Sequence, residues 1–394
     1  MFALFFMIAF VTGLQNPMGI IVKEQFQVPN WMSQLGNFAN FIAYACMGIP
    51  AGIMLQRIGY KKTALTAIVV GFVGVGISFL SGQVESFTVY LIGAFVSGFS
   101  MCMLNAVVNP MLNTLGGGGN RGSCNSIGAT IVPVLVGYLM GDVYSASISK
   151  ANPALFLAMG IFALAFIVLS FVKIPEPHLV TAKKEKEKHS PFSFRHFVLG
   201  TLAIFFYVGV EVGIANFANL FMTQSVDKGG LAIDTTVAGT IAGTYWFLML
   251  IGRLTGASLG AKFSSKSMLT FVSSLGILLI LLAIFLPLST TVNMPVFKSD
   301  ISFGLAEVPI GIMLMILCGL CTSVMWGNIF NLAAASGIFM VMVCGGGVLP
   351  LIQGAVADGF GYLASFWVII VALAYILYYA QVGSKNVNKD IPVE

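Results

Sequence analysis

The sequence predicts an all-α membrane protein with twelve transmembrane helices in two pseudo-symmetric six-helix bundles. Three features predict it: the composition, the spacing of the apolar segments and one charged segment in the middle. Of the 394 residues, 58% are hydrophobic and 8% are charged, whereas a soluble domain carries about 25% charged residues. A surface of this composition cannot face water, so we expect lipid around the helices.

Apolar segments follow one another along the whole chain, and a bilayer core about 30 Å thick takes roughly 20 residues per helix. The first segment lacks a basic start and a cleavage pattern, so we interpret it as a helix rather than a signal peptide. Between Val308 and Gln353 two helices are expected to meet at Asn331–Ala334 with almost no loop. The predicted helices are 2–22, 31–55, 62–82, 87–112, 123–141, 153–174, 196–222, 235–260, 267–287, 306–331, 332–356 and 361–382.

The charged run KKEKEKH at Lys183–His189 separates two sets of six helices. It divides the chain into an N-terminal bundle (1–174), a cytoplasmic linker (175–195) and a C-terminal bundle (196–394). Two such bundles place a solute site between them near the bilayer midplane, and transport follows by alternating access.

The positions of the basic residues predict the orientation, because cytoplasmic loops are enriched in Lys and Arg. With both termini in the cytoplasm, only four of the 19 basic residues lie outside: Lys23, Lys150, Lys228 and Lys298. The net charge of +5 is then a consequence of topology, and we expect no nucleic-acid partner.

Metal and enzyme chemistry find little support in the residues. The six cysteines fall within or beside apolar segments, where a thiol packs as a small hydrophobe. The CxxC at Cys318–Cys321 has no histidine or second cysteine pair nearby. All three histidines lie in or beside the linker. We therefore expect no metal, no cofactor and no catalytic set of nucleophile and base.

One carboxylate, Glu211, lies well inside a predicted helix. An ionisable group in hydrocarbon costs several kcal/mol unless it faces a cavity or a partner. Glu211 is therefore a candidate for substrate binding and ion coupling, with a structural hydrogen bond as the alternative. Arg253, toward the cytoplasmic end of its helix, is expected to snorkel or to form a structural pair.

Amide and indole side chains inside the helices are candidates for a sugar site. Each amide offers donors and an acceptor, as sugar hydroxyls do, although such groups also hold helices together at about 0.6 kcal/mol per bond. An indole face packs against the C–H face of a pyranose. The substrate-binding candidates besides Glu211 are Gln15, Asn16, Asn37, Asn105, Asn125, Asn328, Trp246 and Trp326.

Several motifs resemble a known family. GIMLQRIGYKK (Gly52–Lys62) resembles the loop 2–3 signature of the major facilitator superfamily, with Gln56 where an acidic residue is usual. NPMLNTLG, CNSIGA, FYVGVE, YWFLMLIGR and GGGVLPLIQGAVAD resemble the fucose permease-like sugar transporters within it. The resemblance implies the major facilitator fold and a monomer that carries a hexose or deoxyhexose into the cell with a cation. For a bacterial protein it also implies the inner membrane.

Matched residue by residue, the resemblance supports sugar binding better than proton coupling. Asn125 and Trp326 match an amide and an aromatic residue of the sugar site, whereas Asn16 and Asn105 stand where the family has carboxylates. Amides cannot titrate, so three alternatives remain: Glu211 as the proton site, Na⁺ held by oxygen ligands, or uncoupled diffusion of sugar. An exporter of amphipathic molecules is a further alternative; it would have a larger apolar cavity and few amides.

Overall fold

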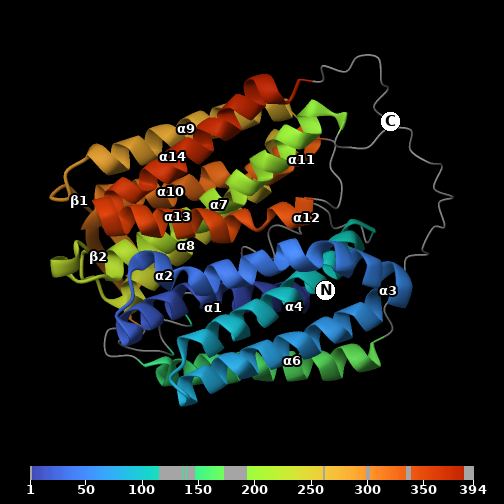
Figure 1. Cartoon of the computed structure of the whole chain (residues 1–394). Coiled ribbons are helices and arrows are strands. Elements are labelled where there is room, and N and C mark those ends of the chain that lie inside the picture. The colour runs from blue at the N-terminus through green and yellow to red at the C-terminus, as the bar shows by residue number, and fades with distance from the viewer. Residues whose placement is uncertain are drawn as a thin grey trace.

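The computed structural model describes residues 2–114, 135, 139, 147–172, 193–260, 262–298, 302–333 and 339–385. Figure 1 shows two groups of helices side by side, the N-terminal half (α1 to α6) below and the C-terminal half (α7 to α14) above. The N-terminal half consists of α1 (Phe2–Phe26), α2 (Asn30–Ser33), α3 (Leu35–Gln83), α4 (Phe87–Thr114), a short 3₁₀ turn (Ile148–Ala151) and α6 (Asn152–Phe171).

The C-terminal half begins with α7 (Arg195–Thr223) and contains a small sheet besides its helices. Its further helices are α8 (Thr235–Leu259), α9 (Ser265–Phe285), α10 (Ile310–Ser323), α11 (Met325–Ala333), α12 (Phe339–Met342), α13 (Gly345–Phe360) and α14 (Tyr362–Tyr378). A 3₁₀ turn (Val226–Lys228) follows α7, and a π-helical turn (Tyr379–Gly383) follows α14.

Within the described part of the chain, eight helical stretches are long and apolar enough to cross a membrane. One of them, α3, has 49 residues and would measure roughly 74 Å if it were straight, more than twice the bilayer core. Gly59, with φ 82° and ψ 174°, turns the chain back within it. The sequence places a helix boundary in the same region, between 55 and 62. The chain is thus a multi-pass membrane protein.

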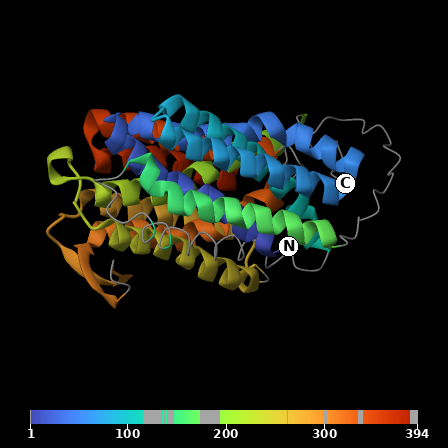
Figure 2. The same ribbon diagram turned by 90° about the horizontal axis from the view of Figure 1, so that it is seen from below.

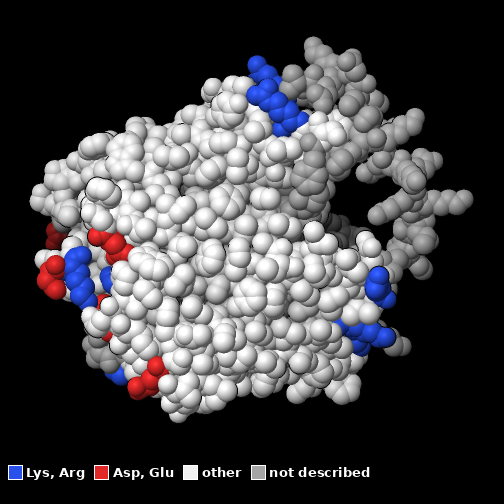
Figure 3. Space-filling model, viewed as in Figure 1, with Lys and Arg blue, Asp and Glu red and all other residues white. Residues whose placement is uncertain are grey.

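On the face shown in Figure 3, charged side chains lie at the two ends, and the middle carries none. Large apolar side chains are exposed along the flanks, among them Phe171 (85%) and Phe271 (66%). Hydrocarbon is the solvent that accommodates such a flank. The structure therefore confirms a helical membrane protein and shows that its flanks expose large apolar side chains.

A β-hairpin corrects the purely helical expectation. β1 (Thr291–Phe297) pairs antiparallel with β2 (Phe303–Pro309), so that Thr291 lies opposite Pro309. The predicted helix 306–331 accordingly begins at Ile310 and is interrupted at Val324. Met294, Val296 and Val308 are buried, and packing of this face holds the hairpin on the helices. Figure 2 shows the hairpin projecting from one end of the bundle.

The second predicted boundary also shifts. The helix expected at 332–356 is replaced by the end of α11, which stops at Ala333, and by α12 and α13, which run from Phe339 to Phe360 with a break before Gly345. Residues 334–338, where the tight turn was expected, lie outside the described residues.

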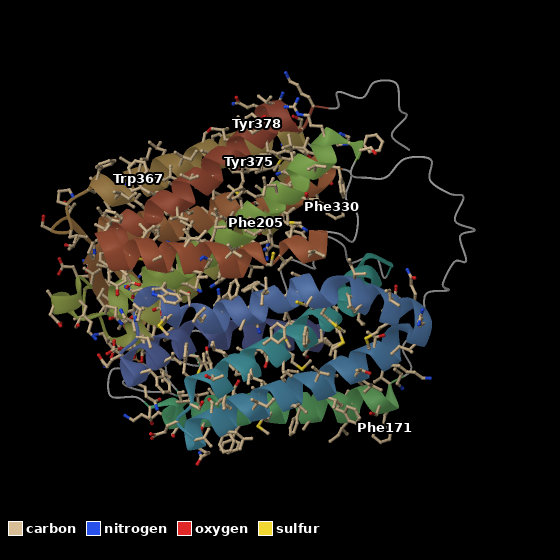
Figure 4. All side chains as sticks on the ribbon, in the orientation of Figure 1. Phe171, Phe205, Phe330, Trp367, Tyr375 and Tyr378 are labelled. Carbon is tan, nitrogen blue, oxygen red and sulfur yellow. The ribbon has the colours of Figure 1, made fainter. Side chains whose placement is uncertain are left out.

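We name the two ends of the molecule by what they carry. The hairpin end holds β1, β2, α2 and the turn between α13 and α14 (Figure 1). The linker end is the opposite one, where α6 ends and α7 begins; Figure 4 shows Phe171 and Phe330 there. At this end Lys61 donates to the backbone carbonyl oxygens of Ser170 (2.8 Å) and Val172 (2.9 Å).

Close contact between α13 and the N-terminal half forms the seam between the halves. A Cβ on Gly347 would lie 2.8 Å from the Cα of Phe38, and one on Gly354 would lie 2.6 Å from the Cα of Trp31. Both distances are too short for any side chain. The glycines of α13 therefore let the backbones of the two halves approach, as small residues do in membrane helices.

Candidate functional site

Two helices of the C-terminal half bring an ion pair into the apolar interior. Nη2 of Arg253 on α8 lies 3.4 Å from Oε1 of Glu211 on α7, and the two side chains are 15% and 12% exposed. Arg253 lies six residues before the end of α8. The expectation that it snorkels is wrong, because α7 supplies a carboxylate within reach. Of the two roles expected for Arg253, the structure shows the pair.

Tyr207 connects this ion pair to Trp326. It lies one helical turn before Glu211 on α7, and its buried hydroxyl makes no hydrogen bond in the structure, although it lies near enough to both Glu211 and Arg253 for electrostatic interaction. Its ring meets that of Trp326 on α11 edge to face, with 6.0 Å between the centroids. Two predicted site residues, Glu211 and Trp326, are thus brought together by a tyrosine that was not selected. The spacing of four residues in FYVGVE places Tyr207 and Glu211 on one helix face.

The pair Tyr245 and Trp246 extends the same cluster along α8. The Tyr245 hydroxyl and Oγ1 of Thr322 on α10 lie 3.0 Å apart and share a hydrogen bond, and Tyr245 is fully buried. The Trp246 ring packs edge-on against Tyr245 at 5.3 Å and is half-buried. Trp246 lies seven residues before Arg253, which is two turns along the same face of α8. It therefore shares a helix face with the ion pair.

The N-terminal half contributes a second polar group. Asn105 on α4 donates through Nδ2 to the Tyr44 hydroxyl on α3 and to the Met101 carbonyl, both at 3.0 Å. Asn37, near the start of α3, donates to the carbonyl of Gly346 on α13 at 2.8 Å, across the seam. The alternative role of these amides, hydrogen bonding between helices, is therefore present in the structure.

The other amide candidates are placed less fully. Asn328 on α11 donates to the carbonyl of Val324, at the break between α10 and α11, at 2.9 Å. Gln15 and Asn16 lie on α1, and their side chains are outside the described part of the chain. Asn125 lies wholly outside it.

The two halves of the molecule meet at Gly346 of α13. A Cβ on Gly346 would lie 2.9 Å from both Phe41 on α3 and Val208 on α7. Phe41 stacks on Tyr44 of the N-terminal group, with centroids 5.9 Å apart, and Val208 follows Tyr207 of the C-terminal group. Side chains from both halves, Asn37 and Phe41 on one side and Val208 on the other, thus adjoin Gly346 of α13, in the region where a site between two bundles is expected.

No metal centre is apparent in this part of the molecule. Among the described residues, no group of three or more His, Cys, Asp or Glu side chains lies together. Cys318 and Cys321 are buried and form no disulfide. Burial of both thiols among apolar neighbours is the packing role expected of small hydrophobic side chains.

Comparison with known proteins gives relatives of nearly the same length. The chain is 28% identical over 405 residues to the glucose/galactose transporter of Brucella abortus biovar 1 (strain 9-941), which covers 97% of this chain and 93% of that protein. It is 22% identical over 435 residues to the L-fucose-proton symporter of Escherichia coli (strain K12), covering 98% and 93%.

The fold has a solved counterpart. The crystal structure of the transporter FucP in the outward conformation matches with a TM-score of 0.63 at 20% identity, covering 98% of this chain and 99% of that one. The profile of the Major Facilitator Superfamily matches residues 1–337, which confirms the resemblance seen in the motifs. The chain belongs to the Major Facilitator Superfamily.

Proposed function

We propose that this protein imports a monosaccharide, a hexose or deoxyhexose, by alternating access. It is a transporter of this superfamily and not an enzyme. The observation that carries the proposal is the buried cluster of Tyr207, Glu211, Arg253 and Trp326, which places polar and aromatic side chains in a chain with only 8% charged residues. Relatives named for glucose, galactose and fucose support the same substrate class.

The chemistry of the cluster suits a sugar. The Trp326 ring offers an apolar face for the C–H side of a pyranose. Charged partners such as Glu211 and Arg253 form the stronger hydrogen bonds with hydroxyl groups. On the other side of the seam, the hydrogen bonds described for Asn37 and Asn105 use Nδ2, and we assign their Oδ1 atoms to sugar hydroxyls. Gln15, Asn16, Asn125, Trp246 and Asn328 complete the proposed set.

We assign cation coupling to Glu211, with a proton as the first choice and Na⁺ as the second. A proton on Glu211 removes its negative charge and so weakens the attraction of Arg253. Protonation would then loosen the connection between α7 and α8, and that is how an ion could alter the geometry of the sugar site. The remaining alternative is uncoupled diffusion, in which the pair is only structural.

Uptake into proteoliposomes tests the proposal. Radiolabelled hexoses are offered while the pH gradient and the Na⁺ gradient are varied independently. We expect accumulation that follows one gradient, and we expect Glu211→Gln to abolish accumulation while exchange of sugar down its gradient persists. Glu85→Gln, at an exposed carboxylate, is the control. Accumulation that survives Glu211→Gln would remove Glu211 from coupling, and no uptake of any hexose would favour the exporter.

We also propose the orientation, with twelve crossings in two bundles (1–174 and 196–394) and both termini in the cytoplasm. The linker end carries Arg57, Lys61, Lys62, Arg195, Lys262, Lys266 and Lys385. The hairpin end combines four basic residues with Glu24, Glu85, Asp227, Asp234, Glu307 and Asp358, and Figure 3 shows acidic residues only at that end of the face in view. Enrichment of Lys and Arg is typical of the cytoplasmic side, and among the described residues the linker end is the one enriched in them. In a bacterial cell this is the inner membrane, and we propose a monomer.

A further inference from the structure

The same short motif occurs at the two opposite ends of the molecule. Gly52, Gln56 and Gly59 have the spacing of Gly354, Asp358 and Gly361, and a tyrosine follows each motif. Gly59 has φ 82° and ψ 174° and lies at the linker end; Gly361 has φ 90° and ψ 166° and lies at the hairpin end. The backbone therefore forms the same type of turn at both ends of the molecule, at Gly59 and at Gly361. The side chain at the fifth position differs: the amide of Gln56 at one end and the carboxylate of Asp358 at the other.

Asp358 uses both carboxylate oxygens to bind the other half of the molecule. Its Oδ1 accepts the backbone N–H of Asn30 at 2.8 Å, and its Oδ2 accepts that of Trp31 at 3.0 Å. Hydrogen bonds to an ionised acceptor are roughly twice as strong as neutral ones. Contact of Gly354 with the backbone of Trp31 brings the carboxylate within this range. The bond pair exists only while α13 lies against α2.

Further polar contacts join the halves around Asp358. The Tyr362 hydroxyl donates to Oδ1 of Asn30 at 3.0 Å and accepts from Nζ of Lys23 at 2.8 Å. Nζ of Lys23 also donates to Oε1 of Gln224 at 2.8 Å. Each of these bonds runs between the N-terminal and C-terminal halves. A pocket of about 450 Å³ adjoins Asp358, Lys23 and Tyr362, so water has access to the groups once they separate.

We propose that Asp358 is a latch that stabilises the state closed at the hairpin end. We propose further that the lack of a carboxylate at Gln56, the matching position at the linker end, favours this state at rest. Opening the hairpin end separates α13 from α2 and breaks both bonds to Asp358. Gln56, at the matching position, has no carboxylate with which to hold the linker end closed in return. The inference rests on the alternating access of the proposed function, but it requires no particular sugar.

Removing either side of the Asp358 bonds tests the latch. In Asp358→Asn, the amide keeps one acceptor and turns donor hydrogens toward a backbone N–H, so at least one bond is lost. Asn30→Pro removes the backbone donor instead, and proline suits the first position of a helix. Asn30→Ala removes only the side chain and is the matched control for it. Asp227→Asn, at an exposed carboxylate of the same end, is the control for the charge.

Opening is measured as a thiol reaction in the full-length protein, reconstituted without sugar and without its native cysteines. Ser33, on α2, is 2% exposed, so the reaction rate of Ser33→Cys with a membrane-impermeant maleimide follows the fraction of open molecules. Val226, 71% exposed at the same end, gives a reference thiol in Val226→Cys. Its rate should not depend on opening.

We expect Asp358→Asn to raise the Ser33→Cys rate about tenfold, the scale of a hydrogen bond to a charged group. Asn30→Pro should react several times faster than Asn30→Ala, and Gln56→Asp should also raise the rate because it adds a carboxylate at the linker end. Asp227→Asn and the Val226→Cys reference should stay unchanged. If Asp358→Asn does not fold, the comparison of Asn30→Pro with Asn30→Ala still measures the bond.

Three results would count against the inference. Equal rates for Asn30→Pro and Asn30→Ala, or an unchanged rate in Asp358→Asn, would show that the carboxylate holds no state closed. An unchanged rate in Gln56→Asp would remove the proposed difference between the two ends. Because no sugar is present in the assay, a failure of sugar uptake would not affect either outcome.

Discussion

The ion pair between Glu211 and Arg253 allows its structural role to be separated from a role in coupling. At 3.4 Å, two unit charges attract by about 5 kcal/mol at an effective dielectric constant near 20. Removing one partner of a buried pair costs about 3–5 kcal/mol, because the other charge stays buried alone. Both side chains retain some exposure, 15% and 12%. We therefore expect Glu211→Gln to lower the free energy of unfolding by about 3 kcal/mol.

The double variant Glu211→Leu/Arg253→Met supplies the comparison. Replacing both members of a buried pair by apolar side chains is often neutral for stability, so we expect the double variant to unfold within about 1 kcal/mol of the natural protein. Unfolding is followed in mixed detergent micelles with increasing denaturing detergent. The natural protein, Glu211→Leu, Arg253→Met and the double variant form a double-mutant cycle that gives the coupling energy of the pair.

Sugar accumulation in the same variants decides the role of Glu211. If Glu211 couples a cation to the sugar, the double variant is stable but does not accumulate sugar. A double variant that is stable and concentrates sugar would refute the assignment and leave the pair as a structural one. If Glu211→Gln lowers the free energy of unfolding by less than about 1 kcal/mol, the pair is well hydrated, as exposed ion pairs are.

Two further predictions concern the sugar site and the seam. We expect Trp326→Ala to weaken hexose binding by about 1–3 kcal/mol, the scale of a buried aromatic contact, as measured by titration calorimetry. Trp367→Ala, at an exposed residue of α14, is its control, and an unchanged dissociation constant would assign Trp326 to packing. We expect Gly347→Ala to lower the unfolding free energy by about 1–3 kcal/mol, because its Cβ would lie 2.8 Å from the Cα of Phe38. At Gly160, where a Cβ meets nothing within 4 Å, the same change should stabilise the helix by about 0.5–1 kcal/mol. Equal effects at both glycines would refute the close approach of the two halves.

Several expectations held because they depend on one residue and its neighbours in the chain. Glu211 stands out as a charge within an apolar segment, and a buried partner follows from the cost of burying a charge. The helix boundary near Gly59 follows from the length of a bilayer crossing. No comparable sequence pattern predicted the β-hairpin, because Thr291–Pro309 is a short stretch between two helices. Its strands form only because Met294, Val296 and Val308 find a surface to cover.

Which side chains contact one another could not be predicted from the sequence. Arg253 could have extended to the membrane surface, as Lys and Arg side chains do, and only the packing of α8 against α7 turns it to Glu211. Tyr207 and Trp326 are 119 positions apart, and their contact depends on where α11 crosses α7. The hydrogen bonds of Asp358 to α2 join residues more than 300 positions apart. No sequence motif near Asp358 or near α2 predicts these bonds.

The sequence alone was sufficient to predict that this protein lies in a lipid bilayer. Transfer of a helix into hydrocarbon is a sum over its own residues, so composition and spacing suffice to predict lipid around the chain and a hidden carboxylate within it. Which groups meet at the seam was decided by the tertiary structure. A hydrogen bond or ion pair requires two atoms within about 3 Å in the right direction, and only the packed arrangement of helices from both halves sets those positions.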